Sequence, residues 1–209
     1  KPVVQHLVQR AHCGSVHLAG RAAQLGRGES LLREIAALVE GTEKTVSVEV
    51  NPHFTTFEEI VKEGEKLAAI SPNFVIKLQA QEAAWKAIPY LAEKGIRTNL
   101  TLVFSASQAL QAMRMGAFFV SPFIGWKESS GEDTREFIED CVTMRDNFGY
   151  ETEIIVAAVR TGAQIVHAAA AGADIVTAGL DVYKEAFDHP YTHEGIRRFT
   201  AFWDKTPYE

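Results

Sequence analysis

From residue 41 onward, short apolar runs rich in β-branched residues alternate with longer stretches of helical periodicity. We predict strands at residues 46–50, 74–78, 96–104, 117–123, 153–159 and 173–178. Four of the helical stretches end at a glycine, as helices do when the residue after the last turn needs a positive φ angle. Strands that alternate with helices pair in parallel through right-handed crossovers. The pattern therefore predicts an α/β fold with a parallel sheet.

The polar residues inside these runs distinguish a closed barrel from an open sheet. In residues 46–50 (VSVEV) valines alternate with polar residues, and Asn99 shares a strand face with Thr101. Ser121 and Phe123 share a face in the same way, because side chains two apart on a strand point to the same side. A central strand of a doubly wound sheet is apolar on both faces, whereas a barrel strand has one face toward the lumen. The sequence favours a (β/α)8 TIM barrel.

The beginning of the chain fits this pattern less closely. Residues 2–8 and 14–19 are the candidates for the two strands that the barrel still needs, and residues 30–40 are predicted to form an amphipathic helix. We interpret residues 1–209 as a single barrel domain in which segment 1–40 is atypical.

The end of the chain is predicted to be helical as well. Residues 192–205 form an amphipathic pattern within a C-terminal helix and tail at 190–209, and the apolar side of this helix is unusually large for a chain end. An apolar helix face must be covered. We therefore expect it to pack on the barrel or on a neighbouring subunit.

Composition and charge exclude several classes of protein. Hydrophobic residues make up 46% and charged residues 23% of the chain, and the formal net charge is -6 without a basic stripe. No nucleic-acid partner is expected, since such a surface needs clustered Lys and Arg. No apolar run approaches the roughly 18–20 residues that cross a bilayer, so we expect no membrane partner and a cytoplasmic location. Cys13 and Cys141 lie far apart and the seven histidines lack ligand spacing, so no metal site is predicted.

Lys77 is the first candidate for chemistry. It lies inside residues 73–79 (NFVIKLQ), a strand that is otherwise apolar over several positions. Burial removes hydration from an ammonium group, which disfavours the charged form and lowers the pKa of the lysine. A desolvated amine can attack a carbonyl carbon and form a Schiff base. The alternative is a structural lysine that extends from the strand end to solvent.

Polar and aromatic residues on neighbouring strands favour the catalytic interpretation. Five of them fall late in their predicted strands, where catalytic groups of barrels gather: Glu49, Asn99, Thr101, Ser121 and Phe123. Glu49 can move a proton, directly or through water, and Thr101 can hold that water. Asn99 can orient the lysine or a substrate hydroxyl. Each could instead be a satisfied polar group of the lumen, but together they indicate a site.

As a set, these segments resemble the transaldolase family, in particular small transaldolases and fructose-6-phosphate aldolases. The similarity runs from about residue 41 to 204 with order and spacing intact. It is carried by residues 46–50, 73–78, 95–105, 108–117, 120–125, 171–177 and 189–196. The resemblance implies an enzyme that acts on a small sugar or sugar phosphate, needs no metal or organic cofactor, and forms a homo-oligomeric ring.

Residue by residue, the resemblance implies that Lys77 is the Schiff-base lysine of a transferase. Glu49 and Thr101 match the pair that holds the catalytic water, and Asn99 and Ser121 match residues that line the site. The implied reaction is the transfer of a dihydroxyacetone unit between sugars, of the pentose-phosphate type. The protonated imine serves as the electron sink.

Two positions separate the activities within this family. Phe123 and Glu49 match transaldolases, whereas fructose-6-phosphate aldolases typically carry tyrosine and glutamine there. This favours transfer over simple aldol cleavage. Arg160 matches a cation that binds the substrate phosphate.

The chain also departs from the family pattern. Residues 1–28 contain no aspartate and only Pro2 among prolines, so a proton-moving aspartate and a Thr-Asn-Pro motif are missing. Trp126 occupies the place of a phosphate-binding arginine, with Lys127 next to it, and Ala158 replaces a phosphate-binding serine. Tryptophan cannot supply the bidentate donor fork of an arginine.

These departures leave two further hypotheses open. An aldolase of the dihydroxyacetone or fructose-6-phosphate type, acting on unphosphorylated dihydroxyacetone or hydroxyacetone, suits the weakened phosphate site. A barrel that has lost catalysis and serves in binding or assembly suits the missing aspartate, unless His6, His12 or His17 takes its place.

Overall fold

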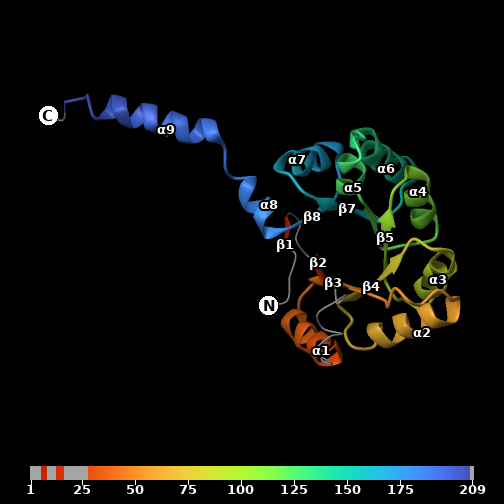
Figure 1. The fold of residues 1–209 in the computed structure, drawn as a ribbon. Helices are drawn as coiled ribbons and strands as arrows, with labels where there is room; N and C mark the ends of the chain where they lie inside the picture. The colour runs from red at the N-terminus through yellow and green to blue at the C-terminus, as the bar shows by residue number, and fades with distance from the viewer. Residues whose placement is uncertain (1–5, 9–12, 17–27, 208–209) are drawn as a thin grey trace.

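The structure of the chain is a computed structural model that describes residues 6–8, 13–16 and 28–207. The described strands form a curled sheet whose outer side is covered by helices (Figure 1). The strands are β1 (His6–Val8), β2 (Cys13–Val16), β3 (Thr45–Glu49), β4 (Phe74–Gln79), β5 (Thr98–Val103), β6 (Phe119–Pro122), β7 (Glu153–Val159) and β8 (Ile175–Ala178). The helices are α1 (Gly28–Val39), α2 (Phe57–Ala68), α3 (Glu82–Glu93), α4 (Ala106–Arg114), α5 (Gly125–Ser129), α6 (Arg135–Phe148), α7 (Gly162–Ala171), α8 (Leu180–Glu185) and α9 (Pro190–Trp203).

The six predicted strands are confirmed as β3 to β8, with ends that agree within two residues. They pair in parallel in chain order, and β2 adds a further parallel strand beside β3. The glycines predicted to end helices, at positions 95, 116, 149 and 172, have φ angles between 64° and 89°. The helix-then-strand pattern of the sequence thus yields a parallel α/β sheet, as predicted.

The prediction of an all-parallel barrel is wrong at β1. This strand pairs antiparallel with β8, and the sheet order runs β1-β8-β7-β6-β5-β4-β3-β2. Only the four residues 9–12 separate β1 from β2, whereas a parallel crossover needs a dozen or more residues. A strand at residues 2–8 therefore cannot be followed by its own covering helix. The remaining parts of the predicted strands 2–8 and 14–19 lie outside the described residues, as do the side chains of His6, His12 and His17.

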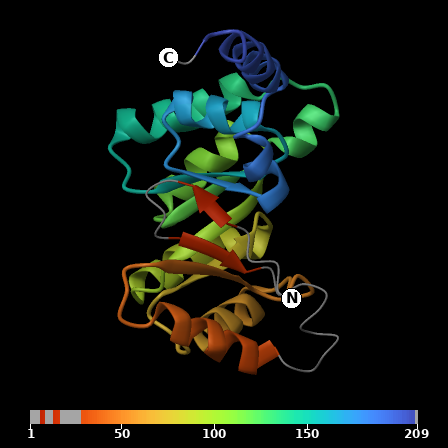
Figure 2. The same cartoon turned by 90° about the vertical axis from the view of Figure 1, so that its left-hand side faces the viewer.

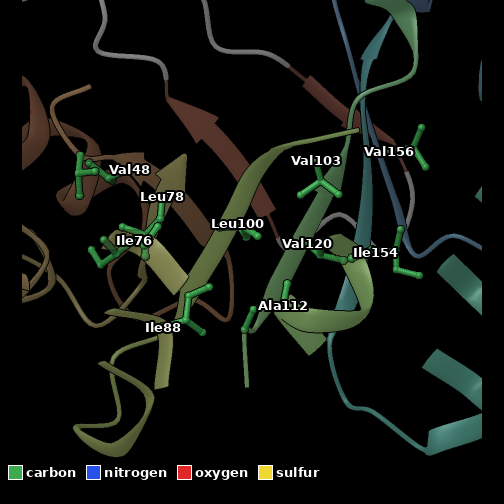
Figure 3. Close-up of a cluster of buried hydrophobic side chains, with 14 of the residues drawn as sticks. Val48, Ile76, Leu78, Ile88, Leu100, Val103, Ala112, Val120, Ile154 and Val156 are labelled. Carbon is green, nitrogen blue, oxygen red and sulfur yellow. The ribbon is translucent and has the colours of Figure 1, made fainter. Parts of the chain in front are cut away.

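Apolar side chains on the outer face of the sheet form the main core. Val48, Ile76, Leu100, Val120 and Ile154 point from successive strands toward the helices (Figure 3). Each is fully buried, and burying such a side chain contributes roughly 1.5–3 kcal/mol. The helices are therefore held on this face by the alternation that the sequence displays.

A second, smaller core lies on the inner face of the sheet. It consists of Val75, Phe119, Ile155 and Ile175. Val75 precedes Lys77 by two residues and Phe119 precedes Ser121 by two residues, so each pair shares a strand face. This apolar layer therefore forms a floor beneath the polar residues nearer the carboxyl ends of the strands.

Two β-bulges interrupt the sheet near its carboxyl ends. The register shifts between Leu100 and Val103, and again between Val156 and Val159. Leu102 and Ala158, inside these bulges, each have a φ of 58°, a conformation that costs roughly 1–2 kcal/mol in an L-residue. Val103, and not Leu102, joins Leu100 in the main core on the outer face, because the bulge interrupts the alternation of side chains.

Helix α9 projects away from the sheet (Figure 1). It spans Pro190–Trp203, about two residues earlier than predicted, and none of its residues, all of which the structure describes, is buried. Packing of this helix on its own sheet, one of the two expected arrangements, is not seen (Figure 2). Among the helices of the described ranges, none has the length and apolar character that crossing a membrane requires.

Candidate active site

Lys77 lies on the inner face of the sheet, between two outward-facing core residues of β4, Ile76 and Leu78. It is 5% exposed, which excludes a lysine that extends to solvent. Its neighbour in the register of β3 is Glu49, whose Oε2 lies 3.7 Å from Lys77 Nζ. Burial disfavours the charged amine while a nearby carboxylate favours it. The two groups form a close pair in which a proton can be exchanged.

A chain of buried hydroxyl and amide groups lies beside Lys77. Ser121 Oγ donates to Asn99 Oδ1 at 2.8 Å, and Asn99 Nδ2 donates to Ser47 Oγ at 3.0 Å. Asn99 was expected late in its strand, but it is the second residue of β5. It still reaches the site because the stagger of the strands places it opposite Lys77 in the register. Ser47, which the sequence did not single out, anchors the chain of hydrogen bonds from β3.

Thr101 and Gln79 form the next layer toward the carboxyl ends of the strands. They are opposite each other in the register of β4 and β5. Gln79 Nε2 donates to Glu49 Oε1 at 2.9 Å and to the carbonyl oxygen of Val50 at 3.2 Å. Thr101 is 1% exposed, and among the described residues its Oγ1 has no hydrogen-bond partner. Sequence reasoning missed Gln79, although a second polar residue two positions after Lys77 was a signal for it.

Three aromatic rings pack together just beyond the carboxyl ends of β5 and β6. Trp126 stacks on Phe104 with ring centroids 5.6 Å apart, and it meets Phe123 edge-on at 5.9 Å. Phe123 comes directly after β6 and Trp126 lies on α5. Trp126 remains 53% exposed. Its indole therefore presents a large apolar surface to solvent, where a substrate can contact it.

Arg160 directly follows β7 and faces α5. Its Nη1 donates to Ser129 Oγ at 2.7 Å, and its backbone N–H donates to Gln164 Oε1 at 2.6 Å. The side chain is anchored at one end while the residue stays exposed. Lys127, the other cation beside Trp126, pairs with Glu132 at 2.5 Å. Arg160 is thus the guanidinium at this corner that is positioned to meet an anion.

The strained backbone of Ala158 packs closely against α5. A Cβ atom added to Gly125 would lie 2.0 Å from the carbonyl oxygen of Ala158 and 3.2 Å from Arg160 Nε. Real contacts of this kind do not occur, so only glycine fits at position 125. The bulge in β7, the glycine and Arg160 are therefore one packed unit.

Other kinds of chemistry find less support in the described residues. They contain no group of three or more His, Cys, Asp or Glu side chains that could hold a metal ion. Burial raises the pKa of the Cys141 thiol to about 12, so this cysteine is not a thiolate nucleophile at neutral pH. The buried lysine on the inner face remains the best candidate nucleophile.

Comparison with known proteins adds to this geometry. Residues 28–206 match the family described as transaldolase/fructose-6-phosphate aldolase. The chain belongs to this family. It is 52% identical over 181 residues to the 6-deoxy-6-sulfo-D-fructose transaldolase of Priestia aryabhattai, covering 86% of this chain and 80% of that protein. It is 41% identical over 177 residues to a probable transaldolase of Dictyoglomus turgidum, covering 85% and 80% respectively.

Family membership makes the chain a transaldolase-type transferase, which confirms the resemblance read from its sequence. Trp126 and Ala158, two positions where the sequence was expected to depart from the family pattern, both lie beside Gly125. Trp126 follows Gly125 in α5, and the Ala158 carbonyl and Arg160 pack against Gly125. The two positions thus lie together at the corner of the site that holds Arg160.

Proposed function

We propose that this transaldolase takes a dihydroxyacetone unit from a ketose by forming a Schiff base on Lys77. The observation that carries the proposal is the burial of Lys77 on the inner face, 3.7 Å from Glu49 and above an apolar floor. A neutral amine is the nucleophile, and a dry environment disfavours its protonation. A barrel without catalysis, the alternative, would not need a buried lysine beside a carboxylate.

The reaction can be written with the residues of the site. The amine of Lys77 adds to the C2 carbonyl of the ketose, and loss of water gives a protonated imine. The C3–C4 bond then breaks as its electron pair moves toward the imine nitrogen and a proton leaves the C4 hydroxyl, which becomes an aldehyde. The enamine left on Lys77 adds to an acceptor aldehyde, and water releases the new ketose. Glu49, with a water held by Thr101, moves the protons.

The remaining predicted site residues have binding roles in this proposal. Asn99 and Ser121 hold the hydroxyls of the three-carbon unit, because both lie beside Lys77 and carry donors and acceptors. Phe123 covers the reacting carbons, and Arg160 binds the anionic end of the donor. Carbons 1 to 3 thus lie near Lys77, and the distal end of the sugar reaches the corner formed by α5 and β7.

We further propose that the donor carries a sulfonate, as in 6-deoxy-6-sulfo-D-fructose. A sulfonate is a monoanion, whereas a phosphate monoester carries about −1.5 to −2 charges at neutral pH. One guanidinium matches the smaller charge, and Lys127 is already paired with Glu132. Trp126 supplies apolar surface where the family pattern has a second cation. The relative from Priestia aryabhattai, 52% identical, is named for that substrate.

Replacing Trp126 tests this choice of donor. Trp126→Arg adds a second guanidinium and removes the indole, so we expect the ratio of kcat/KM for 6-deoxy-6-sulfo-D-fructose over fructose 6-phosphate to fall about 10-fold, the value of one charge-assisted hydrogen bond. Rates are measured with D-glyceraldehyde as acceptor. Trp126→Phe retains an aromatic ring and should keep the preference for the sulfonate. A wild-type enzyme that prefers fructose 6-phosphate would contradict the proposal. A rate of donor cleavage that is the same with and without D-glyceraldehyde would favour the aldolase alternative.

We also propose that α9 packs on a second copy of the chain, in a homo-oligomer. Ile196, Phe199 and Phe202 on this helix are 58%, 75% and 68% exposed, and apolar surface of this extent on a helix is normally covered. The double variant F199E/F202E should therefore reduce the molar mass in solution to that of a single chain, as measured by light scattering. An unchanged mass would show that the assembly, if any, uses another surface.

A further inference from the structure

Gln79 is a buried polar residue of the site to which the family pattern and the reaction above assign no role. It ends β4, two residues after Lys77, and is 9% exposed. Its amide nitrogen donates to Glu49 Oε1 at 2.9 Å and to the Val50 carbonyl at 3.2 Å. Glu49 ends β3 and Val50 directly follows it. The side chain therefore bridges the two strands that carry the amine and the carboxylate.

We propose that Gln79 is a positioning residue, which holds the Glu49 carboxylate toward Lys77 and shares with Thr101 the water that moves protons. The proposal rests on the proposed function, since it concerns how Glu49 performs proton transfer for a Schiff base. The hydrogen bonds that the Gln79 amide donates go to Glu49 and to the Val50 carbonyl. Gln79 acts through Glu49 and through the water.

The first half of the proposal follows from the two oxygens of Glu49. Oε1 accepts from Gln79, while Oε2 lies 3.7 Å from Lys77 Nζ. Because Oε1 is fixed, the carboxylate cannot rotate freely, and Oε2 is kept on the side of the amine. A hydrogen bond donated to a carboxylate also favours its ionised form. Gln79 thus keeps Glu49 both oriented and able to accept a proton.

The orientation of the amide is determined by its surroundings. The nitrogen end meets two acceptors, a carboxylate and a backbone carbonyl. If the amide were turned around, its oxygen would face both of them without a donor, which is unfavourable. Gln79 Oε1 therefore points away from these two acceptors.

The second half of the proposal follows from two buried oxygens that lack partners. Within the described part of the chain, neither Gln79 Oε1 nor Thr101 Oγ1 has a hydrogen-bond partner. The two residues are opposite each other in the register of β4 and β5. Buried polar atoms are normally satisfied by protein or by ordered water. A single water can donate to Gln79 Oε1 and bond to the hydroxyl of Thr101, next to the carboxylate that Gln79 orients.

The test uses the full-length enzyme and Gln79→Met, which keeps the length of the side chain and removes both hydrogen-bonding groups. We expect kcat to fall about 10- to 100-fold, as for loss of a hydrogen bond to a charged group, with little change in KM. The acidic limb of the kcat–pH profile should move to higher pH, because Glu49 without its donor is protonated more easily. Borohydride capture of dihydroxyacetone on Lys77 should persist, since the amine is untouched.

Two further variants separate positioning from a structural effect. Gln81→Met removes an amide two residues further along the chain, which among the described residues donates to the Phe54 carbonyl, and it should leave kcat and the pH profile unchanged. Gln79→Glu is the same size, but can donate to Glu49 only when one proton is shared between the two carboxyl groups. We therefore expect its activity to recover as the pH is lowered.

The outcomes distinguish this proposal from the proposed function. If the wild type is not captured by borohydride, the Schiff-base function fails, whatever Gln79 does. If the wild type is captured and turns over, but Gln79→Met retains its kcat and pH profile, the positioning role is overturned. A lower kcat with an unmoved acidic limb and a lowered melting temperature would overturn it too, since that pattern marks a merely structural residue.

Discussion

Lys77→Met is expected to abolish capture of dihydroxyacetone or a ketose donor by borohydride, and to lower turnover by about 10⁴-fold or more, since no other group can replace a covalent nucleophile. Methionine has nearly the volume of lysine and is tolerated in apolar surroundings. The fold should therefore survive, because the side chain is buried between the apolar floor and the polar layer. Mass spectrometry of the intact protein after reduction measures the adduct.

The control for this prediction is an exposed lysine. Lys86 pairs with Glu82 on the surface of α3. The Lys86→Met variant should form the borohydride-reduced dihydroxyacetone adduct and turn over the donor like the wild type. Both variants replace a lysine amine by a thioether, so a difference between them reflects the position of the amine. An adduct on Lys77→Met, or an unmodified mass for the wild type, would contradict the role of this amine.

The Schiff base explains why Lys77 needs both its burial and its partner. A fully hydrated lysine would be almost entirely protonated at neutral pH, and a protonated amine cannot attack a carbonyl. Glu49 opposes the effect of burial through its charge, but at 3.7 Å it is also near enough to take the proton through water. Burial of Lys77 thus disfavours the protonated amine, and Glu49 can accept the proton that the amine gives up.

The sequence predicted the central part of the fold because its signals are local. Alternation within β3 and β5 and the glycines that end helices depend only on residues a few positions apart. The site around Lys77, Glu49 and Thr101 could be predicted as well, since parallel strands bring their carboxyl ends to one edge of the sheet. The single-domain organisation of the chain stays a prediction.

The features that the sequence did not predict depend on distant contacts. The antiparallel direction of β1 depends on the length of its connection and on pairing with β8, at the other end of the chain. The bulge at Leu102 changes which side chain enters the core, although a simple alternation continues through the sequence. The sequence did not indicate a role for Gln79 at the end of its largely apolar strand, because its hydrogen-bond partner Glu49 is 30 residues away.

Arg160→Met is the second change with a large expected effect. We expect kcat/KM for 6-deoxy-6-sulfo-D-fructose to fall about 100-fold, the value of two charge-assisted hydrogen bonds of about 1.5 kcal/mol each. Borohydride capture of dihydroxyacetone, which has no anionic end, should be unchanged. The comparison of two measurements checks this prediction: kcat/KM for 6-deoxy-6-sulfo-D-fructose, and the yield of the dihydroxyacetone adduct after borohydride reduction.

The same variant tells binding apart from a structural effect. Arg160 is exposed and bonds to the equally exposed Ser129, so its loss should alter the free energy of unfolding by only about 0.5 kcal/mol. Arg114→Met, an exposed arginine on α4 bonded to Gln111, is the matched control and should keep full activity. Arg160→Lys should recover part of the affinity, because it restores the charge without the planar fork that holds two oxygens at once.

If Arg160→Met instead impaired capture of dihydroxyacetone as strongly as turnover of the sulfonated donor, Arg160 would support the nucleophile and not the anion. The distal end of the donor would then have to lie elsewhere than the corner between α5 and β7.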